Sequence, residues 1–180
     1  MLLCALVAAH PAAHAADGIE IVQAHLEPGP DGYRLSATYA FDLTHGLEDA
    51  LARGVPLYFT TDVEINRPRW YWFDEKTIRA SQTARISYNV LTRQYRASII
   101  GSLQQNFSSL DDALTLIKRP SRWEVAPPNA LKPGETYNVA IHIELDVTQL
   151  PKPFQVNALN NADWRLSSDW KLFNFRVEAR

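Results

Sequence analysis

The sequence predicts a mostly β protein, an immunoglobulin-like antiparallel β-sandwich with two short helices. Three observations support this prediction: apolar and polar residues alternate in several segments, turn-forming residues separate the first two of these segments, and only two stretches have helical spacing. Alternation places one face of a strand in a core and the other in water. We expect seven or eight strands in a single domain over residues 16–180.

Each expected strand shows a period of two. The first covers residues 19–26 and is followed by a turn signal at 28–32, Pro-Gly-Pro-Asp-Gly. The others cover residues 33–43, 55–65, 84–89, 95–99, 137–147 and 173–177. The alternation is clearest in the 137–147 segment, where Ile141 and Ile143 are expected to face the core.

Two stretches have helical spacing instead. Residues 47–51 form one short apolar face, with Thr44 as the expected N-cap. Residues 110–117 carry apolar side chains at i, i+3, i+4 and i+7. Ser108 is the expected N-cap of this second helix, and Pro120 is expected to end it.

A proline-rich segment near the C-terminus is expected to be extended. It covers residues 150–155, Leu-Pro-Lys-Pro-Phe-Gln, and each proline disfavours helix at the residue before it. Trp164 and Trp170 follow. The segment can serve either as a binding groove beside these tryptophans or as a stiff crossover that closes one edge of the sandwich.

Residues 1–15 are expected to be a signal peptide that is truncated at its start. Residues 2–9 are apolar, and Ala-His-Ala at 13–15 matches the small-residue pattern that precedes signal cleavage, although the usual positively charged start is missing. The apolar run is too short to span a bilayer. We therefore expect a periplasmic or secreted mature protein that does not span the membrane. The alternative is a buried N-terminal helix of a cytosolic protein.

Composition and motifs restrict the possible functions. The net charge of −2 and the pI of about 6.2 argue against a nucleic-acid partner, and the single cysteine excludes a disulfide framework and a cysteine zinc site. The chain lacks the common catalytic, phosphate-binding and zinc-binding motifs. We expect no cofactor, no metal and no catalytic residue. His142 beside Glu144 could share a metal or a proton, but a solvated strand face accounts for both.

Residues 67–96 have an unusual composition, with seven basic residues and only two acidic ones. The same stretch contains the aromatic run Trp-Tyr-Trp-Phe at 70–73. Interleaved arginine and aromatic residues are typical of protein interfaces and of anionic lipid contacts. The candidate partner surface consists of Arg67, Arg69, Trp70, Trp72, Arg93 and Arg96. A hairpin around residues 88–95 would let its four arginines converge. The alternative is a strand buried on both faces, with arginines covering the rings.

Several longer phrases resemble a known family. They are RGVPLYF at 53–59, RPRWYWFDEK at 67–76, SYNVLTRQYR at 87–96 and QLPKPFQVNAL at 149–159. Over roughly residues 18–176, the chain resembles the exported Gram-negative bacterial family catalogued as domain of unknown function 4390, and departs from it at the N-terminus. The resemblance implies a small exported protein and suggests the ectodomain of a membrane sensor kinase as a partner. It brings no catalytic residues.

These observations lead to one main functional hypothesis and two alternatives. The main hypothesis is a non-catalytic periplasmic interaction module that contacts a membrane-protein ectodomain, as an accessory to a sensor kinase, or another envelope component. The first alternative is a small-ligand or lipid-binding protein with a pocket between the sheets. The second is an enzyme whose site is assembled from residues distant in sequence.

Overall fold

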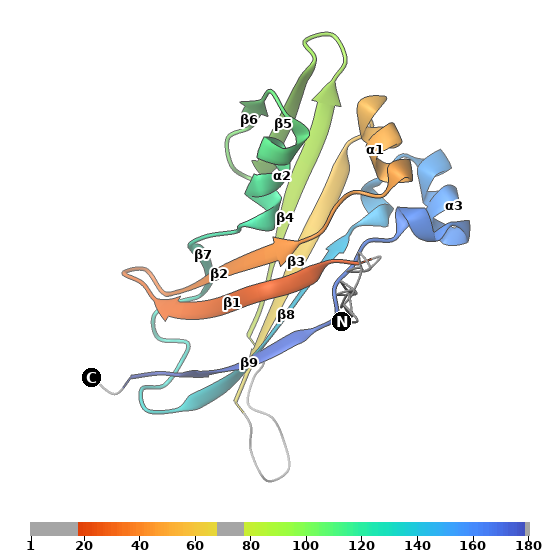
Figure 1. Cartoon of the computed structure of the whole chain (residues 1–180). Coiled ribbons are helices and arrows are strands. Elements are labelled where there is room, and N and C mark those ends of the chain that lie inside the picture. The colour runs from red at the N-terminus through yellow and green to blue at the C-terminus, as the bar shows by residue number, and fades with distance from the viewer. Residues whose placement is uncertain (1–17, 68–77, 179–180) are drawn as a thin grey trace, which may run out of the picture.

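The chain forms two antiparallel β-sheets with short helices at their ends (Figure 1). The computed structural model describes residues 18–67 and 78–178, so the predicted signal peptide at 1–15 lies outside the described residues. The smaller sheet has the order β1-β2-β7, with bounds Glu20–Pro28, Tyr33–Ala40 and Trp123–Ala126. The larger sheet has the order β6-β5-β4-β3-β8-β9, with bounds Gln105–Phe107, Gln94–Ile99, Ile78–Asn89, Leu57–Asn66, Thr136–Leu145 and Lys171–Arg176.

The two sheets pack against each other through apolar faces. In Figure 1, β1 and β2 cross in front of β3 and β8. The ring of Phe41, just after β2, lies 5.4 Å from that of Phe59 on β3, and Tyr33 on β2 lies 5.9 Å from Phe175 on β9. The side chains between the sheets form one hydrophobic core cluster.

The predicted class is therefore confirmed as mostly β with antiparallel sheets, but the immunoglobulin-like arrangement is not confirmed. A constant-type immunoglobulin domain divides seven strands into sheets of four and three. Here the described strands divide into sheets of three and six. In the small sheet β2 pairs with β7, whereas β3 to β6, which lie between them in the sequence, belong to the large sheet.

The alternation predicted from the sequence is clearest in the two central strands. Along β3 every second residue is buried, and β8 repeats the pattern. Ile141 and Ile143 face the core, with 0% and 1% of their surface exposed. The alternate residues of both strands point to the opposite, outer face of the large sheet, which is the solvent side of this sandwich.

The two predicted helices are present. Helix α1 spans His45–Ala52 and buries its apolar face. Thr44 occupies its N-cap position, but its hydroxyl donates to the carbonyl oxygen of Asp163 and does not cap the helix. Helix α2 spans Leu110–Lys118, and its N-cap is Ser109, so the Ser108 assignment is wrong by one residue.

The correction at α2 has a simple cause. Ser109 Oγ accepts the amide of Asp112 at 3.2 Å and donates to its carboxylate at 2.6 Å. Two adjacent serines followed by two adjacent aspartates satisfy the same capping spacing in either register. The spacing alone therefore does not distinguish them.

The extended conformation predicted for residues 150–155 is also wrong, because a third helix, α3, spans Lys152–Asn160. Pro151 and Pro153 lie before it and in its first turn, where a missing N–H costs no intrahelical bond. The side-chain amide of Gln155 donates to the carbonyl oxygens of Thr148 and Leu150 at 2.6 and 2.7 Å, which ties the helix to the preceding turn.

Helices α1 and α3 meet at one end of the sandwich through short 3₁₀ turns. The turns η1 (Val147–Gln149) and η2 (Ala162–Trp164) flank α3. Trp164 is buried, its ring lies 5.3 Å from that of Phe154 on α3, and its indole borders Gly46 of α1. None of the helices in the described residues is long and apolar enough to cross a membrane.

The strands β1 and β9, each at an edge of its sheet, are joined at one point. β1 carries an irregularity in its pairing between Ile21 and Gln23. At this bulge, the ammonium group of Lys171 on β9 donates to the carbonyl oxygens of Ile21 and Val22 at 2.7 and 3.0 Å. A single side chain therefore satisfies two main-chain oxygens on the outer edge of β1.

Candidate functional site

The strongest candidate lies on the outer face of the large sheet, near the β4–β5 hairpin. Ala84 and Ile86 of β4 point into the core, so Arg85 and Ser87 between and beside them point outward. Across the hairpin, Ser87 pairs with Arg96. Arg85 and Arg96 are thus diagonal neighbours on one face, with Cβ atoms about 7 Å apart.

A tyrosine from the next strand completes this cluster. Tyr58 of β3 pairs with Arg85, and the guanidinium carbon of Arg85 lies 5.9 Å from the centre of its ring. This distance is typical of a cation–π contact. We call Tyr58, Arg85, Ser87 and Arg96 the basic–aromatic face.

The two arginines of this face have no acidic partner within the described parts of the chain. Both are half-buried, and the Nε atom of each is covered and makes no hydrogen bond with the described residues. By contrast, Arg79 on the same strand contacts Glu64 at 2.9 Å. Within the described residues, Arg85 and Arg96 thus place two positive charges side by side without a counter-ion.

Of the residues predicted as one partner surface, three are described, and the structure brings two of them together. Arg96 lies on the basic–aromatic face and Arg93 in the turn beside it, but Arg67 follows β3 at the opposite end of the sheet. β4 has 12 residues, so about 40 Å separates the two ends. Arg67 contacts Glu135 at 3.2 Å. Arg67 therefore lies apart from Arg93 and Arg96, although the predicted hairpin is present.

The other predicted site residues, Arg69, Trp70 and Trp72, lie outside the described residues. Sequence reasoning passed over Arg85 and Tyr58, which the structure places beside Arg96. The alternation of residues 84–89 and 95–99 could have identified Arg85, because it puts Arg85 and Arg96 on the polar side of adjacent strands. No pattern in the sequence indicates that Tyr58 lies beside Arg85, because this contact depends on how β3 pairs with β4.

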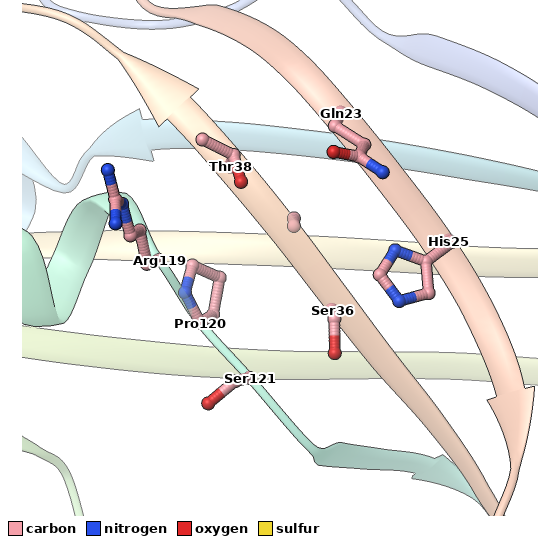
Figure 2. A pocket seen from close by; sticks show the side chains of 8 residues that line it. Gln23, His25, Ser36, Thr38, Arg119, Pro120 and Ser121 are labelled. Atoms are coloured by element: carbon pink, nitrogen blue, oxygen red, sulfur yellow. The ribbon is translucent and has the colours of Figure 1, made fainter.

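A second feature is a polar hollow of about 200 Å³ on the outer face of the small sheet. Figure 2 shows the side chains that surround it, and they come from β1, β2 and the connection between α2 and β7: Gln23, His25, Ser36, Thr38, Arg119, Pro120 and Ser121. The hollow is smaller than pockets that bury drug-sized ligands. It does not lie between the sheets, where the ligand-binding alternative places a pocket.

His142 is covered on one side by an aromatic ring. It points outward from β8 and stacks on Trp170, with ring centres 5.0 Å apart and planes 22° from parallel. Its neighbour in β3 is Asp62. Within residues 18–67 and 78–178, no group of three or more histidine, cysteine, aspartate and glutamate side chains is placed to hold a metal ion.

Fold and surface thus define a mostly β protein of two antiparallel sheets, whose larger sheet carries two neighbouring arginines on its outer face with no acidic partner among the described residues. The chain belongs to the family described as "Domain of unknown function (DUF4390)", whose sequence model matches residues 16–174. Searches of curated proteins and of solved structures gave no significant match.

Proposed function

We propose that this protein is a non-catalytic interaction module of the bacterial cell envelope, exported through its N-terminal segment, that binds an acidic surface of a membrane-protein ectodomain or another envelope component. The observation that carries the proposal is the basic–aromatic face. Arginine and tyrosine are enriched at protein interfaces, and the fully desolvated ones contribute most to affinity. The extracytoplasmic domain of a sensor kinase is one such partner.

The burial of the two arginines supports a binding role over a merely solvating one. A guanidinium whose Nε is covered has lost part of its hydration, so its attraction for a carboxylate is less screened than that of a fully exposed arginine. Diagonal placement of Arg85 and Arg96 also puts two like charges side by side. An acidic partner would relieve this repulsion, because its carboxylates can accept from both guanidinium groups.

The position of the polar hollow also bears on this choice. The ligand-binding alternative requires an apolar pocket between the sheets. The hollow instead lies on the outer face of the small sheet. It therefore gives this alternative no support.

A site-specific crosslinking experiment tests the proposed function. A photoreactive amino acid at Ser98, which pairs with Arg85, should capture an envelope partner in intact cells, whereas the same amino acid at Asn174 on β9 should not. Arg85→Gln combined with Arg96→Gln should abolish the crosslink and leave the melting temperature within a few degrees, since removing two unpaired surface charges costs about 0.5 kcal/mol or less.

Arg79→Gln is the matched control, because Arg79 lies on the same strand but is already paired with Glu64. It should leave the crosslink intact. Capture should also weaken as salt rises, since screening reduces the attraction between the charged surfaces. A crosslink that persists in the Arg85/Arg96 double variant would show that the partner binds elsewhere.

A further inference from the structure

The tip of the β4–β5 hairpin, residues 90–93, has the features of a membrane contact. In Figure 1 this hairpin projects past α1, α2 and the rest of that end of the molecule. Its apex carries two apolar side chains that the fold does not cover, since Leu91 is 95% exposed and Val90 is 57% exposed. Two adjacent apolar residues at the most prominent point of a surface are costly in water and favour burial against something else.

The turn holds this apex in a defined conformation. The side-chain oxygen of Asn89 accepts the amides of Leu91 and Thr92 at 3.0 and 3.1 Å. Arg93 has a φ of 54°, the left-handed conformation that closes the turn. A turn that is already ordered loses little conformational entropy when it binds, so even a small apolar contact can contribute to affinity.

Two arginines flank the apex. Arg93 is part of the turn, and Arg53 precedes Gly54, where an added Cβ would lie 3.9 Å from a methyl group of Val90. Both arginines are exposed. Guanidinium groups donate paired hydrogen bonds to phosphate oxygens, which makes arginine suited to phospholipid headgroups.

Acidic residues of α1 lie near the base of the hairpin. Burial raises the pKa of Tyr95, and the nearby Tyr88 and Glu48 raise it further. Glu48 lies on α1, and Asp49 beside it is held by His45 at 3.5 Å. The tip therefore combines an apolar apex with two exposed arginines.

We propose that the tip dips into the surface of an anionic phospholipid bilayer, with Leu91 and Val90 among the upper acyl chains and the arginines at the phosphates. The convex shape favours a bilayer over a protein partner. A stable protein interface buries about 800 Å² per partner, which four turn residues do not supply. A bilayer accepts a narrow apolar projection without a preformed pocket, and anionic lipid attracts the basic flanks.

This inference goes beyond the proposed partner binding. Arg96 of the basic–aromatic face is three residues from Arg93, or about 10 Å along the strand. A docked tip would hold the basic–aromatic face close to the membrane surface. Partners available there are the parts of ectodomains nearest the bilayer.

Binding of the full chain to vesicles tests the proposal. The probes are vesicles of equimolar phosphatidylglycerol and phosphatidylcholine, and vesicles of phosphatidylcholine alone, in a sedimentation assay at low salt. We expect the protein to prefer the anionic vesicles. Leu91→Ser should weaken that binding by about tenfold or more. Arg53→Gln with Arg93→Gln should weaken it by about fivefold per arginine.

Leu103→Ser provides the matched control, because Leu103 is 90% exposed in the turn between β5 and β6, away from the tip. It should bind as the unchanged protein does. All variants share residues 1–15, so any lipid affinity of that segment cancels in the comparison. Thermal melts confirm that each variant is folded.

Several results would overturn the proposal: no binding of the unchanged protein to anionic vesicles, equal binding of Leu91→Ser and Leu103→Ser, or no effect of the two arginine changes. Loss of the Ser98 crosslink in Leu91→Ser with vesicle binding unchanged would make the tip a protein contact and would likewise reject the lipid assignment.

Discussion

Replacing Ile141 by aspartate is expected to prevent the protein from folding stably. Ile141 is completely buried at the centre of β8. It pairs with Val63 on β3 and with Lys171 at the start of β9. A carboxylate there would lose its hydration, and the ammonium group of Lys171 is already bound to the carbonyl oxygens of Ile21 and Val22. We expect a cost of several kcal/mol. Small domains have a total stability of about 5–15 kcal/mol, so most or all of it would be lost.

Asn138→Asp is the control for this experiment. Asn138 lies on the same strand, is exposed and points to the outer face. The charge is the same, so only burial differs. Urea unfolding followed by circular dichroism should show a transition close to that of the unchanged protein for Asn138→Asp and little or no transition for Ile141→Asp. An Ile141→Asp variant that unfolds at a similar urea concentration would contradict the assigned face of β8.

The second large effect is expected in alkali and involves Tyr39. Its side chain is 3% exposed between the sheets, and its hydroxyl lies 3.4 Å from that of Thr61. Burial raises the pKa of Tyr39 from 10.0 to about 12, and the hydrogen bond to Thr61 offsets only part of this increase. The phenol therefore stays protonated in the folded protein at pH values where it ionises in the unfolded chain.

The sign of the effect follows from proton binding. Because the folded pKa is raised, the stability linked to Tyr39 is fully present below pH 10, and it is lost as the pH rises toward 12. The free energy of unfolding should fall by about 1.4 kcal/mol at pH 11 and by about 2 kcal/mol at pH 12. Tyr39→Phe lacks the ionising group, so its stability should fall less steeply over this range.

Urea midpoints at pH 8, 10 and 11 would measure the difference between Tyr39→Phe and the unchanged protein. The 3.4 Å contact is too long for a strong hydrogen bond, so the two should differ by less than about 1 kcal/mol near pH 8. The difference should then shift in favour of Tyr39→Phe as the pH rises. Parallel curves would show that Tyr39 ionises no later in the folded protein than in the unfolded chain.

The buried faces of individual strands and helices could be predicted from the sequence, because they follow from the spacing of apolar residues. Alternation identified the inward face of β8, including Ile141 and Ile143, because burial of one strand face requires it. The helical spacing of α2 was equally reliable over residues 110–117. Both are local consequences of having one side of an element in a core, and they do not depend on how strands are ordered.

Features that depend on strand order and register could not be predicted in the same way. Residues 67 and 93 were placed together because they are close in a basic stretch, but an extended strand, β4, separates them by its full length. The position of Tyr58 beside Arg85 follows from the pairing of β3 with β4. The spacing of apolar residues within β3 or within β4 does not reveal which residues of the two strands are paired. At residues 150–155, the prolines predict an extended segment, but the first turn of a helix also accepts proline, and α3 begins there.

The contact between Lys171 and the bulge of β1 also bears on how an exposed strand edge avoids pairing with a second chain. An exposed strand edge offers unpaired amides and carbonyls to any other chain, and edge-to-edge pairing starts aggregation. The ammonium group occupies two of these carbonyls and places a positive charge at the edge, while the bulge breaks the regular repeat that a second strand would need. Lys171 thus disfavours pairing of β1 with a second chain. Without it, we expect self-association to increase first at high protein concentration.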